Sequence, residues 1–279
     1  MDKKWLFDRP WTQEFTKVRQ RFIGEFLGAV RKKVELASAL DVGCGIGYFA
    51  EFLASLHFRV VAVDGREENV REGQKRYPKI VFLTKNVETL EASDLGTFDY
   101  VQCVGILYHL ENPFRAIRRL HSLTDKILLI ETMCVPASEP TLELLDEGIG
   151  EDQSLNYVAF YPSESCLIKM LYKAGFPYVY RFERLPADEL FTGSLWRKQQ
   201  RTFLVASKIA LAAHNLALTK QPVRYAYGKA NPWTTRPSRL RDSAKAGLFR
   251  VRVLASRLLR SLRKSVDAKS SDDLTVEEK

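Results

Sequence analysis

Apolar residues recur at steps of three and four near the start of the chain. Between residues 12 and 34 they are Phe15, Val18, Phe22, Phe26 and Val30. This spacing places them on one face of an α-helix. Further along, short apolar runs alternate with charged segments of helical period. The pattern therefore predicts one amphipathic helix, followed by a strand–helix repeat.

The short apolar runs predict the strands of a buried sheet. They are residues 39–42, 59–63, 80–83, 100–104 and 127–130, and helices are expected at 48–56, 67–77 and 113–123. Strands that alternate with helices favour an α/β fold, with a mostly parallel sheet, right-handed crossovers and helices on both faces.

The pattern becomes irregular after residue 131. Residues 133–158 predict an insertion with acidic residues, and 163–174 predict a helix that ends at Gly175. Segments 178–185 and 201–207 alternate like strands, and the linker between them is too short and irregular for a helical crossover. We expect these two strands to form an antiparallel last hairpin.

The most informative motif is ALDVGCGIGYF, residues 39–49, which places three glycines between a strand and a helix. Glycine permits positive φ and lets a ligand approach the bare backbone. The following helix presents unpaired N–H groups. Dinucleotide enzymes use the spacing G-x-G-x-x-G here, whereas this chain has G-x-G-x-G. Taken alone, the motif also fits a tight structural turn.

Asp64 ends the apolar run VVAVD, 17 residues beyond Gly47. An acid at the end of the second strand of such a domain can accept hydrogen bonds from both ribose hydroxyls of a nucleoside. It can also cap the helix that follows, and the two roles are compatible.

Four segments, in this order, resemble motifs of class I S-adenosylmethionine-dependent methyltransferases. They are DVGCGIG, AVDG, KNVE at 85–88 and FDYVQCVGILYHL at 98–110. The resemblance covers about residues 36–208. It implies a Rossmann-like, mostly parallel seven-stranded sheet and S-adenosyl-L-methionine as cofactor. The four cysteines lack the spacing of zinc ligands, so no metal is expected.

The resemblance also implies roles for individual residues. Gly43 and Gly45 would pack against the methionine part of the cofactor, and Asp64 would bind the ribose. Asn86 stands where family members more often have Asp. The full set of implied cofactor-binding residues is Asp41, Gly43, Gly45, Gly47, Asp64, Asn86, Val87, Val104 and Arg201.

His109 and Tyr108 are the candidate catalytic residues. A general base is needed only if the acceptor is a poorly acidic hydroxyl or a protonated amine. His109 follows the fourth predicted strand at its carboxyl end, where open α/β sheets bind ligands. The alternative is that His109 only shapes the loop through backbone hydrogen bonds. Tyr108 fits a cofactor-contacting or positioning role better than that of a base, because the reference pKa of a tyrosine is about 10.

A narrower resemblance concerns the acceptor. GILYHLENP, LLIET and NYVAFYPS resemble segments of the bacterial wobble-uridine carboxymethyltransferases of tRNA and their relatives, in which positions matching Tyr108 and Arg201 contact the cofactor. The N-terminal WLFDRPWTQEF lacks their lysine- and tryptophan-containing stretches, which help to bind a carboxylated cofactor. Ordinary S-adenosylmethionine is therefore expected.

The predicted function is methyl transfer to a small or lipid-linked metabolite. The main alternative is a tRNA-modifying methyl- or carboxymethyltransferase. Two further alternatives are a catalytically idle module that binds the nucleoside and an NAD-dependent enzyme, which the glycine spacing disfavours. Trp5, Phe7 and Trp11 either cover the cofactor pocket or pack against the first helix.

The formal net charge of +9 comes from the end of the chain, because residues 220–264 contain 13 Lys/Arg and one acid. The predicted segments are an N-terminal helical segment at 1–35, a methyltransferase catalytic domain at 36–210, a linker at 211–242, a basic amphipathic helix at 243–264 and a disordered tail at 265–279. Residues 1–219 balance their charges, with 28 bases and 28 acids, so nucleic acid is the less favoured partner.

No signal peptide and no apolar run of about 20 residues is present in the sequence. We therefore expect a cytoplasmic protein. The basic helix at 243–264 can lie on an anionic membrane surface, which would place the protein peripherally at the inner face of the membrane. It can instead contact RNA phosphates or dock on the catalytic domain.

Overall fold

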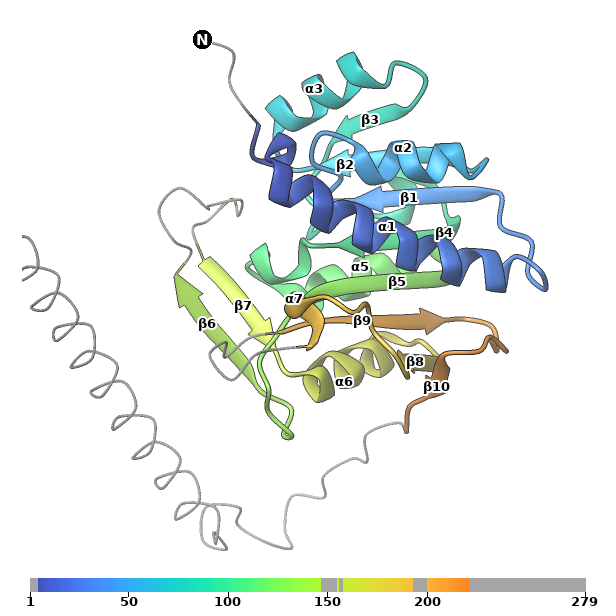
Figure 1. Ribbon diagram of the computed structural model, residues 1–279, viewed down its shortest axis with the longest axis vertical. Helices are drawn as coiled ribbons and strands as arrows, with labels where there is room; N and C mark the ends of the chain where they lie inside the picture. The colour runs from blue at the N-terminus through green and yellow to red at the C-terminus, as the bar shows by residue number, and fades with distance from the viewer. Residues whose placement is uncertain (1–4, 147–154, 156–157, 193–199, 221–279) are drawn as a thin grey trace, which may run out of the picture. The chain divides into compact units, whose positions relative to one another are not determined.

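The computed structural model describes residues 5–146, 155, 158–192 and 200–220. Its centre is an eight-stranded sheet of order β10-β8-β9-β5-β4-β1-β2-β3 (Figure 1). The strands are β1 (Ser38–Val42), β2 (Arg59–Asp64), β3 (Val81–Thr84), β4 (Phe98–Val104), β5 (Thr124–Cys134), β8 (Tyr178–Phe182), β9 (Gln200–Ser207) and β10 (Leu216–Leu218). Strands β1 to β5 are parallel, and β9 pairs antiparallel with both β5 and β8.

Helices cover both faces of this sheet. On one face lie α1 (Pro10–Val30), α2 (Tyr48–Ser55) and α3 (Glu67–Arg76), and on the other lie α4 (Ala92–Leu95), α5 (Pro113–Leu123) and α6 (Glu164–Ala174). The shorter helices are η1 (Leu6–Asp8), η2 (Leu107–His109) and α7 (Glu189–Thr192). The predicted Rossmann-like α/β fold and its antiparallel last hairpin are confirmed.

The predicted strand number was one too low. Residues 216–218 pair antiparallel with residues 180–182 and add β10 at the edge of the sheet. The sheet thus extends past residue 210, into the segment that the sequence assigned to a linker. A strand of three residues is too short to show a period, which is why the sequence pattern did not reveal it.

Side chains of successive sheet residues enter two separate cores. In β4, Val101 and Cys103 pack with α5 and α6, whereas Tyr100 packs with α1. Parallel strands covered on both faces become apolar along their whole length. This explains why the strands appeared in the sequence as continuous runs rather than as alternating patterns.

The buried face of α1 differs from the predicted one. Val18 and Phe22 are only half-buried. The buried residues of α1 are Phe15, Thr16, Arg19, Ile23, Phe26, Leu27 and Val30. A charged residue, Arg19, therefore lies within the stripe that faces the sheet.

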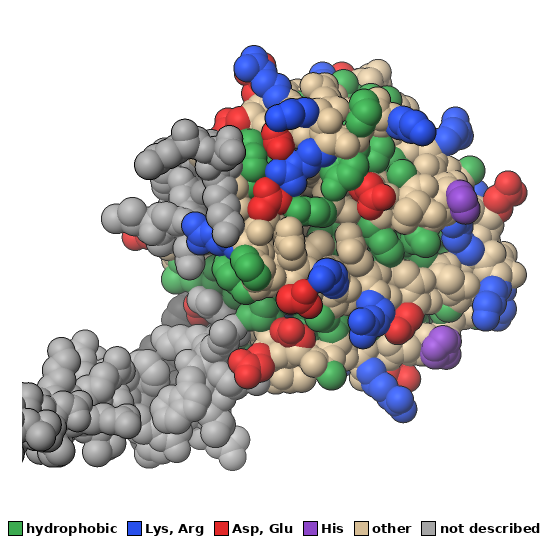
Figure 2. Space-filling model, turned by 45° about the horizontal axis from the view of Figure 1, so that its top comes forward, with side chains coloured by type: hydrophobic (Ala, Val, Ile, Leu, Met, Phe, Trp, Pro, Cys, Tyr) green, Lys and Arg blue, Asp and Glu red, His purple; other side chains and the backbone are tan. Residues whose placement is uncertain are grey.

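A separate antiparallel hairpin, formed by β6 (Leu142–Asp146) and β7 (Val158–Pro162), begins in the predicted insertion and extends beyond its last residue, 158. Asn156 and Tyr157, in the segment NYVAFYPS, lie outside the described residues. So do the predicted basic helix at 243–264 and the predicted tail. Within the described ranges, no helix is long and apolar enough to cross a membrane. Figure 2 shows Lys/Arg and Asp/Glu side chains interspersed over the described face that it presents.

Candidate active site

The glycine turn between β1 and α2 adopts a backbone that side chains disfavour. Gly43, Gly45 and Gly47 have φ values of 70°, 53° and 98°. A Cβ atom on Gly43 would lie 2.4 Å from Cδ1 of Ile106. The N–H of Gly43 donates to the carbonyl oxygen of Val63 at 2.8 Å, which ties the turn to the end of β2. Only glycine fits at residue 43 without displacing Ile106.

Asp64 braces the same turn from the end of β2. Its Oδ2 accepts a hydrogen bond from the N–H of Gly45 at 2.9 Å, and its Oδ1 accepts from the N–H of Arg66 at 2.9 Å and from Nδ2 of Asn69 at 3.1 Å. Burial raises the pKa of the Asp64 carboxyl, and these hydrogen bonds oppose the rise. Asp64 is not the N-cap of α3, which is Arg66. Asp64 also lines a pocket beside the turn.

Asp41 and Gly47, both predicted to bind the cofactor, are not among the residues that line this pocket. The Oδ1 atom of Asp41 accepts from Nε2 of Gln102 at 2.9 Å. Burial raises the pKa of Asp41 to about 7, against the opposing effect of this hydrogen bond. Gly47 directly precedes α2 in a left-handed conformation. Both residues shape the turn, and direct contact with a cofactor stays a prediction for them.

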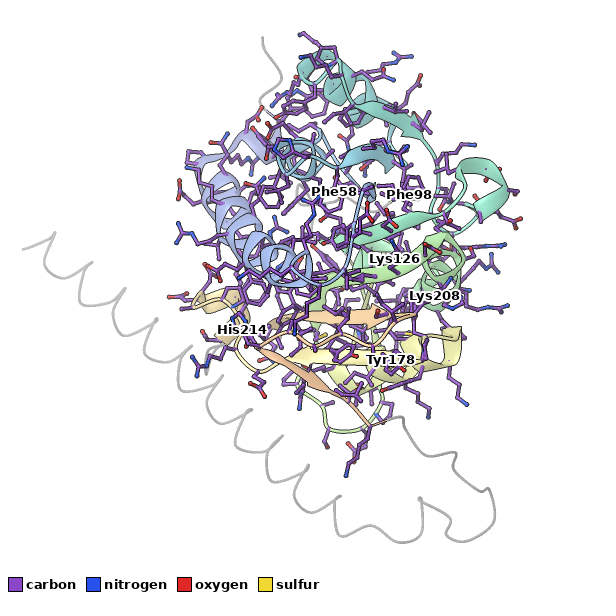
Figure 3. All side chains as sticks on the ribbon, turned by 90° about the vertical axis from the view of Figure 1, so that its right-hand side faces the viewer. Phe58, Phe98, Lys126, Tyr178, Lys208 and His214 are labelled. Atoms are coloured by element: carbon purple, nitrogen blue, oxygen red, sulfur yellow. The ribbon has the colours of Figure 1, made fainter. Side chains whose placement is uncertain are left out.

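A pocket with a volume of about 340 Å³ opens at the carboxyl ends of β1 to β4. Open α/β sheets bind their ligands at this edge. Figure 3 views the opposite end of the sheet, where Phe58, Phe98 and Lys126 mark the starts of β2, β4 and β5. The predicted site residues that line the pocket are Gly43, Gly45, Asp64, Asn86, Val87, Val104, Tyr108, His109 and Arg201.

The N-terminal segment covers part of this pocket. Trp5, Phe7 and Trp11 all line it. A Cβ atom on Gly45 would lie 2.8 Å from the ring of Phe7, so this ring rests on the glycine turn. Of the two interpretations of these aromatic residues, the structure favours the pocket cover.

An ion pair fastens this cover to α3. Asp8, at the end of η1, pairs with Arg76: Oδ1 with Nη1 and Oδ2 with Nη2, both at 2.8 Å. The hydroxyl of Tyr48 also donates to Oδ1 of Asp8 at 2.6 Å. Three segments far apart in the sequence thus meet beside the glycine turn.

Tyr108 and His109 follow β4, within η2. Their rings lie 4.0 Å apart between centroids, and the ring of Tyr161 in β7 meets Tyr108 edge-on at 5.5 Å. Tyr108 is buried, and its hydroxyl accepts a hydrogen bond from Nη2 of Arg201 at 3.1 Å. Both candidate catalytic residues therefore lie on the pocket wall, beside the ends of β4 and β5.

The same region contains two arginines that share one carboxylate. Glu131, near the end of β5, is fully buried. Its Oε1 accepts from Nη1 of Arg201 at 2.8 Å, and its Oε2 accepts from Nη1 of Arg19 at 3.4 Å. Nη2 of Arg19 donates to Oγ1 of Thr16 at 3.3 Å. We call Arg19, Glu131 and Arg201 the arginine cluster.

Burial and neighbouring charges act differently on the two arginines. Burial lowers the pKa of Arg19, Glu131 opposes this, Arg201 adds to it, and the pKa ends below its ordinary value. Burial also lowers the pKa of Arg201, but Glu131 and Tyr108 outweigh it and bring that pKa above its ordinary value. The Glu131 carboxylate also lies closer to Nη1 of Arg201 than to Nη1 of Arg19, at 2.8 Å against 3.4 Å.

Sequence reasoning missed Arg19 and Glu131. Arg19 follows Phe15 by four residues and precedes Ile23 by four, so it falls on the apolar face of α1. Glu131 directly follows the apolar run of β5. A charged residue in an otherwise apolar stripe is the feature that would have indicated both, because buried charges are rare unless they are paired.

The cysteines take no part in this site beyond Cys44, whose thiol is buried in the glycine turn. Burial raises the pKa of Cys44 well above its ordinary value. Among the described residues, no cluster of three or more His, Cys, Asp or Glu could bind a metal ion.

Fold and site together define a class, the Rossmann-like proteins that bind a nucleoside at a glycine turn. A family model described as a methyltransferase domain matches residues 40–126. The N-terminal domain of EvdMO1 with SAH bound has the same fold, with a TM-score of 0.56, 20% identity, and coverage of 67% of this chain and 80% of that one.

Three curated relatives extend this result. Nodulation protein S of Bradyrhizobium diazoefficiens is 26% identical over 192 residues, which cover 63% of this chain and 91% of the relative. A ubiquinone biosynthesis O-methyltransferase of Xanthomonas oryzae pv. oryzae is 34% identical over 121 residues, with coverages of 40% and 51%. A tRNA U34 carboxymethyltransferase of Actinobacillus succinogenes is 30% identical over 148 residues, with coverages of 50% and 44%.

The chain therefore contains a class I S-adenosylmethionine-dependent methyltransferase domain, with S-adenosylmethionine as its cofactor. The resemblance drawn from the sequence motifs is confirmed. The chain spans only about half the length of the ubiquinone and tRNA relatives, at 51% and 44%.

Proposed function

We propose that this enzyme transfers a methyl group from S-adenosylmethionine to a small-molecule or lipid-linked acceptor. One observation carries the proposal: a single pocket runs from the glycine turn and Asp64 to Tyr108, His109 and Arg201. The end with the glycine turn and Asp64, the nucleoside end, offers groups that suit a nucleoside. The end with Tyr108, His109 and Arg201, the acceptor end, offers further polar groups. A donor and an acceptor can thus meet in one enclosed space.

The residues at the nucleoside end fit the cofactor. Bare backbone at Gly43 and Gly45 would face the methionine part, and the Asp64 carboxylate would accept hydrogen bonds from the ribose hydroxyls. The adenine would lie beside Asn86 and Val87, with Val104 beneath the cofactor. Since Asp64 is already oriented by hydrogen bonds from Gly45 and Asn69, binding would require little rearrangement.

The cofactor supplies an activated methyl group on its sulfonium. The protein then has to orient the attacking atom of the acceptor towards that methyl and exclude water. Tyr108, fixed by its bond from Arg201, is positioned to orient groups at this end. His109 would accept the acceptor's proton where the attacking group is a hydroxyl or a protonated amine.

One relative and the distribution of surface charge support an acceptor of this class. The ubiquinone biosynthesis O-methyltransferase has a small-molecule pathway in its name, and it aligns over 121 residues. Interspersed charges on the described face in Figure 2 do not form the continuous basic surface typical of nucleic-acid binding.

Calorimetry tests the proposal. S-adenosylmethionine, S-adenosylhomocysteine and NAD are titrated into the wild type and into Asp64→Ala. We expect the first two to bind and NAD not to bind. Because Asp64 would bind the ribose through charge-assisted hydrogen bonds, its loss should weaken binding by about tenfold to a hundredfold. Asp125→Ala, an exposed acid at the start of β5, is the matched control. Binding of NAD alone would refute the proposal.

A tRNA-modifying methyl- or carboxymethyltransferase is the second candidate. The relative from Actinobacillus succinogenes and the Arg201–Tyr108 hydrogen bond favour it. Adding the carboxylated form of S-adenosylmethionine to the same titration separates the two candidates. A preference of the wild type for the carboxylated form would favour tRNA modification.

The basic helix predicted at 243–264 suggests where the acceptor is found. Arginines opposite a leucine face would attract the helix to an anionic membrane, the place of a lipid-linked acceptor. Deletion of residues 243–279 should then abolish binding to anionic liposomes. Unchanged liposome binding would exclude peripheral attachment through this helix.

A further inference from the structure

The arginine cluster carries a positive charge that the described residues do not balance. Arg19 and Arg201 share one carboxylate, that of Glu131. The acids on the pocket wall, Asp64 and Glu68, belong to the nucleoside end with the glycine turn. Burying an uncompensated cation is costly, so such an arrangement is typical of a site that receives an anion.

Unused hydrogen-bonding capacity accompanies the charge. The Nε atoms of both Arg19 and Arg201 are buried and have no hydrogen-bond partner among the described residues. The side chain of Arg19 is 10% exposed and that of Arg201 is 14% exposed. Both residues line the pocket, so a ligand bound there would lie next to them.

Both guanidinium groups are also fixed in place. The guanidinium carbon of Arg19 lies 4.3 Å from the ring centroid of Phe15, and that of Arg201 lies 5.2 Å from the same centroid. Arg201 further donates to Tyr108. Groups held on several sides lose little conformational entropy when a ligand binds.

The position of the cluster indicates which ligand it meets. In the sheet order, β5 and β9 lie on the side of β4 away from β1 and β2. Arg201, the second residue of β9, pairs with Met133 of β5, whereas Asp64 ends β2. Nη1 of Arg19 lies 3.2 Å from where a Cβ on Gly105, after β4, would be. The cluster therefore lies beyond the end of the pocket that the proposed function gives to the nucleoside.

We propose that Arg19 and Arg201 form a carboxylate-binding subsite that recognises the methyl acceptor. The subsite rests on the proposed function, because it presupposes that S-adenosylmethionine fills the Asp64 end. It makes a carboxylate a determinant of acceptor choice. Planar guanidinium groups match the geometry of a carboxylate, which a single ammonium group would not. The other source of the same chemistry is the carboxylate of the cofactor's own methionine part.

Two titrations distinguish these sources. Benzoate and its neutral counterpart benzamide are titrated into the complex with S-adenosylhomocysteine. Separately, S-adenosylhomocysteine is compared with 5′-methylthioadenosine, which lacks the amino-acid part. Each experiment uses the wild type, Arg19→Gln, Arg201→Gln and Arg201→Lys, with Arg71→Gln as control for the loss of an exposed arginine.

For an acceptor carboxylate, we expect benzoate to bind the wild type better than benzamide does. Either Gln variant should lose about tenfold or more of the benzoate affinity, because each loses a charge-assisted hydrogen bond. Arg201→Lys should recover part of that loss, and Arg71→Gln should match the wild type. If S-adenosylhomocysteine loses affinity instead, the subsite binds the donor carboxylate.

Affinity for 5′-methylthioadenosine reports whether the variants fold and keep the nucleoside end. If it is unchanged while neither carboxylate ligand responds to the substitutions, the subsite proposal is overturned and the arginines are purely structural. If the wild type itself binds no nucleoside, the proposed function fails first. The two failures are thus distinguishable.

Discussion

The two ends of the pocket are built in different ways. At the nucleoside end, Gly43, Gly45 and Asp64 lie within 22 consecutive residues, and the backbone N–H of Gly45 donates to the Asp64 carboxylate. At the acceptor end, Arg19 and Glu131 are 112 residues apart, and Glu131 and Arg201 are 70 apart. The first end depends on backbone conformation, and the second on side-chain charge.

This difference determines which amino-acid substitutions each end of the pocket can tolerate. The glycine turn has little room for other residues, because their side chains would collide with Ile106 or Phe7. A charge cluster assembled from separate elements can be altered one side chain at a time. We therefore expect the nucleoside end to fix the cofactor, while the acceptor end sets the substrate.

The largest effect should follow loss of the shared carboxylate. Glu131→Ala would leave two buried guanidinium groups without a counter-charge, and breaking a buried ion pair in this way costs about 3–5 kcal/mol. The free energy of unfolding, measured in urea, should fall by that amount. The exposed Glu25→Gln on α1 is the control and should change it by less than about 0.5 kcal/mol. A near-neutral Glu131→Ala would mean that the cluster is solvated in solution.

Two glycine substitutions test the nucleoside end. Gly43→Ala should lower the free energy of unfolding by about 1–3 kcal/mol and weaken cofactor binding, because residue 43 has φ of 70° and its Cβ would overlap Ile106. Gly28→Ala is the matched control within α1, where nothing lies within 4 Å of the added carbon. It should stabilise the helix by about 0.5–1 kcal/mol. Equal effects at the two glycines would contradict a backbone-built site.

A pH titration tests the burial of Asp41. Its folded-state pKa of about 7 lies above the ordinary value of 3.8, so the folded state binds this proton more tightly than the unfolded state. The resulting stability is fully present below about pH 4 and is lost as the pH rises towards 7. Relative to Asp41→Asn, which cannot ionise, the wild type should lose about 1.4 kcal/mol for each unit of pH between these two pKa values, measured by urea unfolding at each pH.

Asp99 should change the pH dependence of stability in the opposite direction from Asp41. Burial raises its pKa, but hydrogen bonds from Lys126 and from the backbone at residues 37 and 38 outweigh it and bring the pKa to about 2. Its stabilising contribution is therefore present above about pH 4 and is lost as the pH falls towards 2. The difference in free energy of unfolding between the wild type and Asp41→Asn should fall with rising pH, whereas the difference between the wild type and Asp99→Asn should increase. Equal slopes would contradict the burial of Asp41.

The smallest effect concerns the cover over the glycine turn. Arg76→Met removes the pair with Asp8, in which both side chains are 25% exposed, and should cost about 0.5–1 kcal/mol. Hydrogen exchange should increase at residues 6–12. Arg71→Met, which removes an exposed pair with Glu67, should leave this exchange unchanged. If both variants leave it unchanged, the Asp8–Arg76 pair does not fasten the cover.

Much of the fold could be predicted because the strands are continuous apolar runs between helical segments. Strands β1, β2, β4 and β5 and the antiparallel pairing of β8 with β9 follow from these runs. Strand β10 was missed because three residues carry no period, and the hairpin of β6 and β7 because β6 is exposed. Residues 142 and 144 have leucines that are 42% and 61% exposed, so no buried face marks them.

The candidate site divides in the same way. Gly43 and Asp64 could be predicted because their chemistry follows from local conformation at the end of a strand. Arg19 and Glu131 could not be paired from the sequence, because their contact depends on the packing of α1 across β5, and no local pattern encodes it. The sequence pattern placed Val18 on the buried face of α1, whereas the structure buries the next residue, Arg19. Arg19 was therefore not recognised as a residue that faces the sheet.

The shared carboxylate also makes the two arginines interdependent. If Arg19 is lost, Glu131 can engage Arg201 with both oxygens, so the second guanidinium is held more firmly than before. Effects of substitution at residues 19 and 201 should therefore be non-additive. Position 19 can mutate at little cost to folding as long as Arg201 remains, whereas Glu131 is constrained by both. Such non-additivity would allow substitutions at residue 19 in α1 to change the preferred acceptor, while the sheet and the cofactor stay the same.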